Sequence, residues 1–433
     1  MKGNFQLIII IVFIALAIFG ILVFSGAIPI GNNGTPGSLG TVVLWGTIKA
    51  STMVPILEQF NNANPTFVVK YVQKSPESFD QDLLEALANG AGPDMFFLPD
   101  NLAFHYANKI VSIPYSSYPL ASFKNNFASA GDVFLTSKGI LAFPLSIDPL
   151  MMYYNRSMLD ANGIVSPPVL WDDLVNLVPK LTKKDDSNKI IKSAVALGHF
   201  SNITNAKDIL AALFMQAGNG IIAERNGVFI SVLNGDVSNQ KYNLGSILKF
   251  YTDFADPNNK DVYSWNKSFP NSDVAFSAEN LAFYFGFASE LNSLINRNPN
   301  QNLAVASFPQ IKGASFKLTD AHVTGIALLA SSKNFNTAFT AASLMATGNF
   351  ASQFVLATGV APARRDLLKV KPADAYSPIF YDSALYARSW LDPSVADTDN
   401  IFQNMVDKVL SNDMTVGSAI SDASGKLGLL LLQ

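Results

Sequence analysis

Residues 41–98 read TVVLWGTIKASTMVPILEQFNNANPTFVVKYVQKSPESFDQDLLEALANGAGPDMFFL and alternate two kinds of apolar pattern. Residues 41–45, 67–72 and 95–98 are short apolar runs of strand length. The segments between them have apolar residues at helical spacing, namely Met53, Ile56, Leu57 and Phe60, and then Phe79, Leu83 and Leu87. This order predicts a mostly parallel sheet covered by helices. Pro55 fits the first helix only within its opening turn.

The same alternation continues towards the C-terminus. Strand-like runs recur at residues 140–143, 281–285 and 324–329. Two further helical stripes are expected to face the core, namely Leu244, Ile247, Leu248 and Tyr251, and Phe402, Met405, Val406 and Val409. The sequence shows no repeat of about 20–50 residues, which argues against solenoids and propellers. An α/β fold is therefore expected throughout.

Length and composition restrict the possible classes of function. A chain of 433 residues exceeds an ordinary single core, which predicts two domains or lobes. A net charge of −3 gives no electrostatic footprint for nucleic acid. The sequence has no cysteine, which excludes disulfides, cysteine–zinc sites and a thiol nucleophile. Its 3 histidines are far apart, so we expect no metal centre, no serine–histidine–aspartate triad and no cofactor.

An apolar segment precedes this α/β body. Residues 7–24 are almost entirely apolar and follow Lys2. At about 1.5 Å per residue, such a helix spans roughly 27 Å, close to the thickness of a hydrocarbon core. A signal peptide would end at the small residues 25–27, whereas the length of the run favours a retained anchor with the body outside. We expect residues 1–27 to be a transmembrane anchor or signal peptide and residues 28–40 a flexible linker.

Five segments follow one another in a characteristic order and spacing. They read AGPDMFFLPD at 91–100, GILAFPLSIDPLMMYYNRSMLDANGIVSPPVLWDDL at 139–174, AFSAENLAFYFG at 275–286, HVTGIALLASSKNFNTAFTAASLMA at 322–346 and GVAPA at 359–363. Together they resemble the extracellular solute-binding proteins of ABC importers, in the maltose-binding-like family 1. The chain departs from the family pattern at Arg156, which replaces a lysine, at Val169 and Leu170 before the tryptophan, and in a missing Gly-Lys pair. These departures leave the implied fold unchanged.

The resemblance implies a two-lobed periplasmic-binding-protein-like fold of type II, with hinge-linked lobes around a ligand cleft. The expected extents are residues 41–143 and 324–358 for lobe one, and residues 144–323 and 359–433 for lobe two. The chain is expected to cross between the lobes near residues 143–146, 322–325 and 359–362. Proline and glycine at these places suit the ends of elements that absorb backbone rotation.

The function implied by the resemblance is binding without catalysis. The protein would capture a small solute, a carbohydrate, by hinge closure and deliver it to an ABC permease. We expect an extracytoplasmic monomer, tethered to the cell membrane by its N-terminal helix or secreted if that helix is cleaved. Its partners would be the sugar, the permease and the membrane, and not nucleic acid.

Polar residues that follow strands are the first candidates for ligand contact. In doubly wound sheets, ligands bind outside the carboxyl ends of the strands, where Gly46, Thr47, Asp100 and Asn101 are expected. Ordinary turns and helix N-caps explain the same residues without a ligand. Asp148 follows the first lobe crossing, in a segment where the family places ligand-binding residues; an exposed turn is the alternative.

Aromatic side chains in polar surroundings complete the candidate site. Trp265 lies in a turn-rich loop and Trp390 near an aspartate-rich segment, where their rings would stack on a sugar. Phe287 follows a strand end, and Asn400 belongs to the aspartate-rich segment; core packing is the alternative for the aromatic residues. Trp171, at a predicted helix start, is expected to be structural.

Three other functions remain open on the sequence. An extracytoplasmic glycan hydrolase would need paired carboxylates in one cleft or a nucleophile with its base, and the acids are dispersed. A sensory ectodomain would use the same closure to report its ligand to a membrane partner. A polyamine-type binding protein would need several carboxylates in the cleft, for which Asp100, Asp148 and Asp399 are available.

Overall fold

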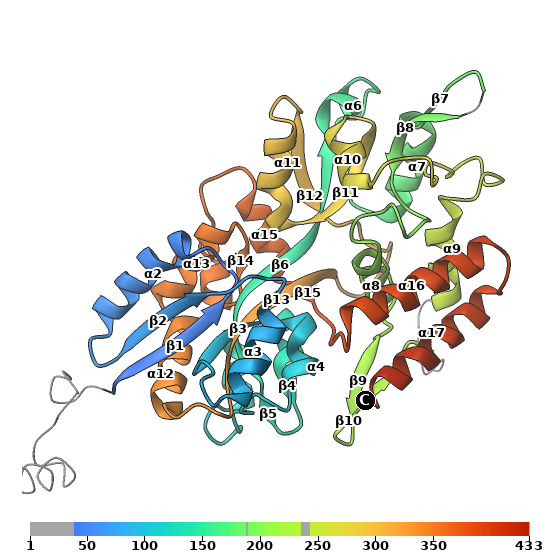
Figure 1. Ribbon diagram of the computed structural model, residues 1–433. Helices are drawn as coiled ribbons and strands as arrows, with labels where there is room; N and C mark the ends of the chain where they lie inside the picture. Colours follow the sequence, from blue (N-terminus) through green and yellow to red (C-terminus); the bar gives the residue numbers. More distant parts are fainter. Residues whose placement is uncertain (1–38, 188, 235–242, 433) are drawn as a thin grey trace, which may run out of the picture.

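A mixed β-sheet extends through the computed structural model, which describes residues 39–187, 189–234 and 243–432 (Figure 1). The strands of this sheet are β1 (Thr41–Gly46), β2 (Val68–Gln73), β3 (Met95–Pro99), β6 (Ala142–Asn155), β7 (Lys183–Lys184), β8 (Ile190–Val195), β11 (Leu281–Phe287), β12 (Leu303–Ser307), β13 (Thr319–Leu328), β14 (Ala361–Pro362) and β15 (Ala387–Arg388). In the described residues these 11 strands have the order β2-β1-β3-β13-β6-β11-β8-β7, with β12 and β14 paired to β6 and β15 to β13. Two small hairpins accompany it, β4 (Leu135–Thr136) with β5 (Gly139–Ile140) and β9 (Ile222–Arg225) with β10 (Val228–Ser231).

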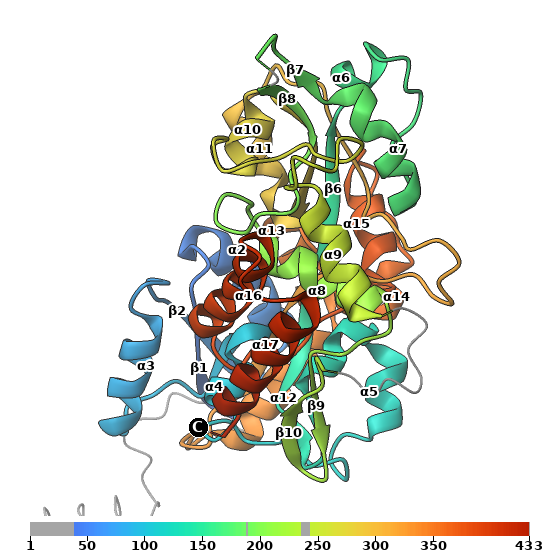
Figure 2. The ribbon, with the colours of Figure 1, turned by 90° about the vertical axis from the view of Figure 1, so that its right-hand side faces the viewer.

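Helices cover this sheet on both sides (Figures 1 and 2). They are α2 (Ala50–Ala63), α3 (Phe79–Ala88), α4 (Ala103–Tyr106), α5 (Leu120–Asn126), α6 (Arg156–Asp160), α7 (Trp171–Leu181), α8 (Ala206–Gln216), α9 (Leu244–Asp253), α10 (Ser272–Ser277), α11 (Leu291–Arg297), α12 (Phe335–Thr347), α13 (Asn349–Thr358), α14 (Arg365–Leu368), α15 (Ser377–Ala384), α16 (Val395–Leu410) and α17 (Val416–Leu430). Short 3-10 turns include η1 (Asp100–Leu102), η2 (Ser129–Phe134) and η4 (Ala288–Glu290). No helix in the described ranges is long and apolar enough to cross a membrane. The N-terminal anchor predicted for residues 1–27 lies outside those ranges, as does most of the predicted linker.

The N-terminal part of the sheet has the predicted parallel arrangement. β1 pairs in parallel with β2 and with β3, and α2 and α3 connect these strands. The predicted stripe of α2 is buried in full. One expectation was wrong: Pro55 is the sixth residue of α2 and so lies beyond its first turn. Burial of the apolar stripe outweighs the one backbone hydrogen bond that a proline removes there.

Two long strands, β6 and β13, join the two ends of the sheet. The first part of β6 pairs with β13, and its last part pairs with β11 and β12. β13 in turn pairs with β3 through its C-terminal residues, and its register shifts between Thr324 and Gly325. A Cβ at Gly325 would lie 2.8 Å from the Cβ of Ala142 and from the Phe134 ring, so the close packing at this position requires glycine. We call β2, β1 and β3 the first sheet half, and β11, β12, β8 and β7 the second.

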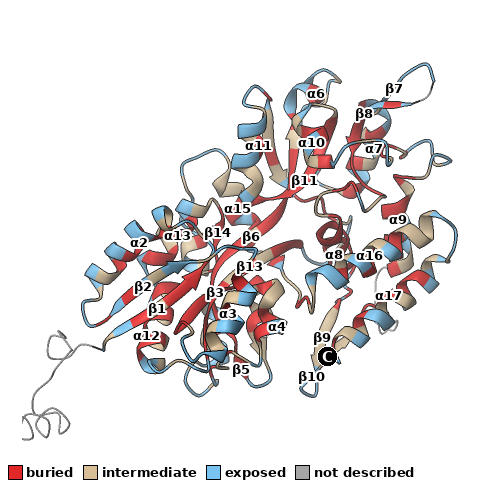
Figure 3. Cartoon of the chain, in the orientation of Figure 1, coloured by how far each residue is buried: buried red, intermediate tan, exposed pale blue. Residues whose placement is uncertain are grey.

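The buried core runs along the sheet (Figure 3). Helices α8, α9, α16 and α17 pack against one another, and α8 packs against β13; we call these four helices the helical layer. The stripe predicted around Leu248 is buried in α9, and most of the stripe around Phe402 is buried in α16. α17 packs against α16, α9 and β10 (Figure 2). Trp171 is buried and donates a hydrogen bond from Nε1 to Gln216 Oε1 at 2.9 Å, which confirms its structural role.

Candidate functional site

A cavity of about 140 Å³ lies beside β13, between residues that follow β3 and residues of α8. Four parts of the chain line it: η1, the start of α8, β13, and the segment from 389 into α16. The lining residues are Asp100, Asn101, Lys207, Asp208, Asp320, Ala321, His322, Ser389, Trp390, Asp392, Val395 and Asp399. Seven of these side chains are ionisable, so the cavity is a concentration of charge at the junction of the two sheet halves.

The pairing of β13 with β3 brings His322 close to Asp100. Thr324 lies opposite Pro99 in the antiparallel register, so the residue two positions earlier in β13 reaches the turn that follows β3. Asp100 accepts hydrogen bonds from the backbone N of Asn101 at 2.9 Å and from the Ser389 hydroxyl. Its Oδ1 lies 3.6 Å from His322 Nδ1. Asp100, which was expected at the carboxyl end of a strand, therefore lies within a cluster of charged residues.

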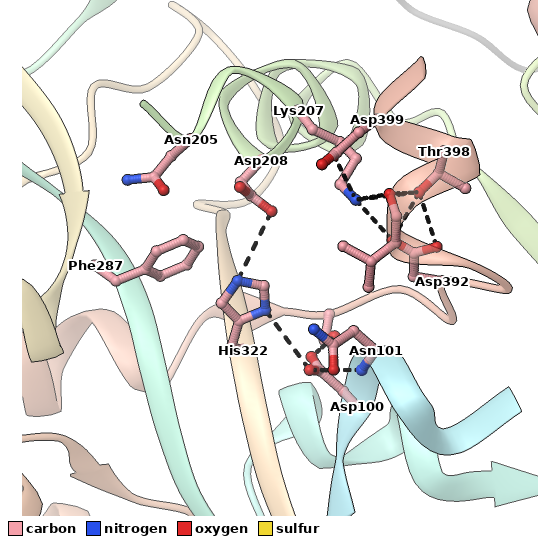
Figure 4. Close-up of polar contacts among 12 residues, drawn as sticks. Asp100, Asn101, Asn205, Lys207, Asp208, Phe287, His322, Asp392, Thr398 and Asp399 are labelled. Carbon is pink, nitrogen blue, oxygen red and sulfur yellow. Dashed lines mark hydrogen bonds and ion pairs between the residues drawn. The ribbon is translucent and has the colours of Figure 1, made fainter. Parts of the chain in front are cut away.

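The first turn of α8 supplies the opposite side of the cluster (Figure 4). Lys207 is 7% exposed, and its Nζ lies 2.8 Å from Asp392 Oδ2 and 2.8 Å from Asp399 Oδ1. Burial lowers the pKa of Lys207, but the two carboxylates outweigh it and the net direction is upward. Asp208 Oδ1 lies 3.9 Å from His322 Nε2, so the imidazole stands between Asp208 and Asp100. These contacts join the first sheet half, β13 and the helical layer.

Phe287 and Asp148 lie next to His322 rather than on the cavity wall. The Phe287 and His322 rings pack with centroids 4.3 Å apart. Asp148 Oδ1 accepts a hydrogen bond from the backbone N of Ser289 at 2.9 Å, and Asp148 lies opposite His322 in the pairing of β6 with β13. Burial raises the pKa of Asp148 to about 6, against the opposing effects of Ser289 and His322. Its carboxyl is therefore part of the same electrostatic cluster.

The charge on His322 should make stability depend on pH. Burial lowers its pKa, but Asp100, Asp208 and Asp320 outweigh burial and raise it from 6.5 to about 10. Because the folded-state pKa is the higher one, the imidazolium stabilises the fold fully below about pH 6.5, and this contribution fades as pH rises through 10. The side chain is 42% exposed, so solvent screening limits the effect to a few degrees in the unfolding midpoint.

The measurement compares thermal unfolding of the wild type with that of His322→Gln from pH 6 to pH 10. The difference in midpoint should be largest near pH 6.5 and should vanish towards pH 10. A difference that stays constant over this range would show that the imidazole acts through packing on Phe287 and not through its charge.

Three of the expected site residues line the cavity, and others do not. Asp100, Asn101 and Trp390 are on its wall. Gly46 ends β1 under Phe97 and Tyr71, where a Cβ would lie 2.5 Å from the Phe97 ring, so packing explains the glycine. Thr47 and Asn400 are exposed and lie outside the lining set.

The expectation that Trp265 faces a ligand is corrected by the structure. The side chain is 0% exposed and stacks on Phe269 with ring centroids 4.4 Å apart. Its Nε1 donates a hydrogen bond to Asn202 Oδ1 at 3.1 Å. The polar neighbours in the sequence therefore satisfy the indole inside the core and do not mark a cleft.

Several charged residues of the cavity were not expected to bind ligand. They are Lys207, Asp208, Asp320, His322 and Asp392, whereas Asp399 had been considered only for the polyamine alternative. The partners Lys207 and Asp392 are 185 positions apart, so no local spacing marks them. Asn205, just before α8, has a φ of 61°, an uncommon backbone conformation for a residue other than glycine, but this feature is visible only in the structure.

A second cavity of about 410 Å³ adjoins the first and shares Ser389 and Trp390 with it. It lies between η2 and residues 218–224, next to the β9–β10 hairpin. Glu224 of this hairpin accepts hydrogen bonds from the backbone N and Oγ of Ser137 at 2.8 and 2.6 Å. The β9–β10 hairpin thus connects α17, against which β10 packs, with the turn between β4 and β5 that contains Ser137.

Comparison with known proteins agrees with this architecture. The model of the bacterial extracellular solute-binding protein family matches residues 45–347, and the chain therefore belongs to that family. The resemblance drawn from the five sequence segments is confirmed. A search of curated proteins gave no match.

Solved structures share the fold at low sequence identity. A cyclo/maltodextrin-binding protein complexed with maltotetraose is 17% identical, with a TM-score of 0.72, and the match covers 92% of this chain and 97% of that one. The sugar-binding protein MalE from Xanthomonas citri is 16% identical, with a TM-score of 0.71 and coverage of 90% and 97%. A maltose/maltodextrin-binding domain from Bdellovibrio bacteriovorus bound to maltotriose is 16% identical, with a TM-score of 0.63 and coverage of 91% and 100%. These similarities establish an α/β solute-binding protein fold.

Proposed function

We propose that this protein is the receptor of an ABC importer and that it captures a carbohydrate outside the cytoplasm. The observation that carries the proposal is the convergence of polar side chains from both sides of one cavity, with Asp100 and Asn101 facing Lys207 and Asp208. Membership of the extracellular solute-binding family supports the extracytoplasmic location and the link to an importer. The similar proteins solved with maltotetraose and maltotriose support a sugar as the ligand.

The proposed mechanism is closure of two lobes around the ligand. Asp100 would bind from lobe one and Asp208 from lobe two, while β6 and β13 act as the hinge strands. A ligand that contacts both sides binds the closed form better than the open form and so shifts the population towards closure. Carboxylates would accept hydrogen bonds from sugar hydroxyls, and Trp390 would stack on a ring face.

The same proposal includes delivery and tethering. The permease would recognise the closed lobes, and the apolar run at residues 7–24 would keep the monomeric receptor near it at a high effective concentration. The lobe boundaries remain those predicted, residues 41–143 with 324–358 and residues 144–323 with 359–433. The chain belongs to a family of binding proteins, and we assign it no catalytic step.

Thermal unfolding of the purified full-length chain against neutral sugars, amino sugars, polyamines, peptides and anions tests the function. A ligand at 100 times its dissociation constant adds about 2.7 kcal/mol to the free energy of unfolding, which raises the midpoint measurably. We expect a selective rise with one family of oligosaccharides, and its loss in Asp100→Asn and Trp390→Ala. Turnover of a glycan without any shift would instead establish a hydrolase.

A further inference from the structure

Negative charge exceeds positive charge around the 140 Å³ cavity. The ionisable lining residues are five carboxylates, Asp100, Asp208, Asp320, Asp392 and Asp399, and two cations, Lys207 and His322. Two of the carboxylates, Asp392 and Asp399, each lie 2.8 Å from Lys207 and more than balance its charge. The other three carboxylates have His322 as their cationic neighbour on the cavity wall.

The single imidazolium of His322 does not neutralise its three carboxylates. Its contacts of 3.6 Å with Asp100 and 3.9 Å with Asp208 are longer than hydrogen bonds. It also carries only one positive charge against three possible negative ones. The cavity wall therefore keeps an excess of negative charge whenever these carboxylates are ionised.

Asp320 has an unpartnered oxygen in this cluster. The residue lines the cavity and is 2% exposed, yet its Oδ1 has no hydrogen-bond partner within the described part of the chain. Burial, together with the charge of Asp208, raises the pKa of Asp320 well above its ordinary range. Burial likewise raises the pKa of Asp208. A buried acceptor without a donor is costly, so a donor from a ligand at this position would stabilise the cluster.

We propose, resting on the proposed function, that the carbohydrate bound here carries a primary ammonium group, as in a glucosamine-type sugar, which binds Asp320 beside Asp208. A hydroxyl can donate one hydrogen bond to Asp320 but brings no charge. An ammonium group donates up to three hydrogen bonds and also cancels negative charge, which makes charge-assisted bonds the stronger ones. Trp390 on the same wall favours a ring-shaped ligand over a linear polyamine, because aromatic faces stack on sugar rings.

The test is isothermal titration of the full-length protein with matched ligands at low salt and pH 7. The ligands are glucose, glucosamine and N-acetylglucosamine, each as monosaccharide and as β-1,4 disaccharide, with spermidine as a non-sugar cation. We expect the glucosamine series to bind about tenfold more tightly than either neutral series, a difference of roughly 1.4 kcal/mol. Asp320→Asn should bring this ratio close to one.

Asp422→Asn is the matched control. It removes the same charge from α17, where Asp422 pairs at 2.7 Å with the exposed Lys426, and it should leave the tenfold ratio unchanged. Asp320→Asn should also fold at least as stably as the wild type, because it removes a buried unpaired carboxyl.

Three other results of the titration would contradict the proposal. Equal or tighter binding of the neutral sugars overturns the ammonium group and leaves the sugar-receptor function standing. Binding of spermidine without any sugar overturns the carbohydrate assignment together with the amino sugar. Binding of none of these ligands overturns the amino-sugar proposal, and the unfolding assay with the wider ligand panel then decides the sugar-receptor function separately.

Discussion

Replacing Lys207 by methionine should lower the free energy of unfolding by about 3 kcal/mol, because the substitution leaves the buried Asp392 carboxylate without its cation. Lys207 and Asp392 are 7% and 4% exposed, and their charged atoms lie 2.8 Å apart. Breaking a buried ion pair at one partner typically costs about 3–5 kcal/mol. The lower end applies here, since Asp392 keeps hydrogen bonds from the Thr398 hydroxyl at 2.9 Å and the Ser394 backbone N at 3.0 Å. Urea unfolding measures the change.

Two further variants separate this ion pair from a general effect of losing a lysine. Lys249→Met removes the exposed pair with Asp253 on α9 and should cost less than about 1 kcal/mol. The double variant Lys207→Met with Asp392→Asn should recover most of the loss, because no buried charge then remains unpaired at that position. If the free energy of unfolding of Lys207→Met lies within about 1 kcal/mol of the wild-type value, the pair does not hold α8 to the segment that leads into α16.

Much of the fold could be predicted because its signals are local. The stripe of α2 and the runs that became β1, β2 and β3 are written in the spacing of apolar residues, and the parallel order follows from strands alternating with helices. What local spacing could not reveal is the long pairing of β6 and β13. That pairing joins residues 142–149 to residues 321–327, and only the resemblance to a known family implied crossings near them.

The candidate site could be predicted only where it follows a general rule. Asp100 and Asn101 directly follow strand β3 and line the cavity, in agreement with the rule that ligands bind outside the carboxyl ends of strands. Lys207 and Asp208 lie in the first turn of a helix, where charged residues are common. Their place in the site depends on β13 and residues 392–399, which are distant in the sequence and pack against them. In the sequence, nothing distinguishes Asp320 from any other polar residue of a strand. Only the structure shows that it is buried and that its Oδ1 has no hydrogen-bond partner in the described residues.

Trp265 and Trp390 should respond to alanine in opposite ways. Trp265→Ala removes a fully buried ring and leaves Asn202 Oδ1 without the indole donor, so we expect a loss of about 3–5 kcal/mol in the free energy of unfolding. Trp390 is half-buried and packs on Phe402 with centroids 6.2 Å apart, so its truncation should destabilise the fold less. Its larger effect should be on ligand affinity, because its side chain lines both cavities.

Urea unfolding and ligand titration of Trp265→Ala and Trp390→Ala give a free energy of unfolding and a ligand affinity for each variant. Together these values test whether Trp265 belongs to the core and Trp390 to the binding site. Trp265→Phe is the control for ring packing: it keeps an aromatic ring against Phe269 and loses only the hydrogen bond to Asn202, so it should recover part of the stability. Any Trp265→Ala protein that remains folded should bind ligand with nearly the wild-type affinity, since the ring is 0% exposed. If that variant keeps its stability but loses ligand binding, the ring must face the cleft, as its polar sequence neighbours suggested. Burial of Trp265 would then not describe the form of the protein that binds ligand.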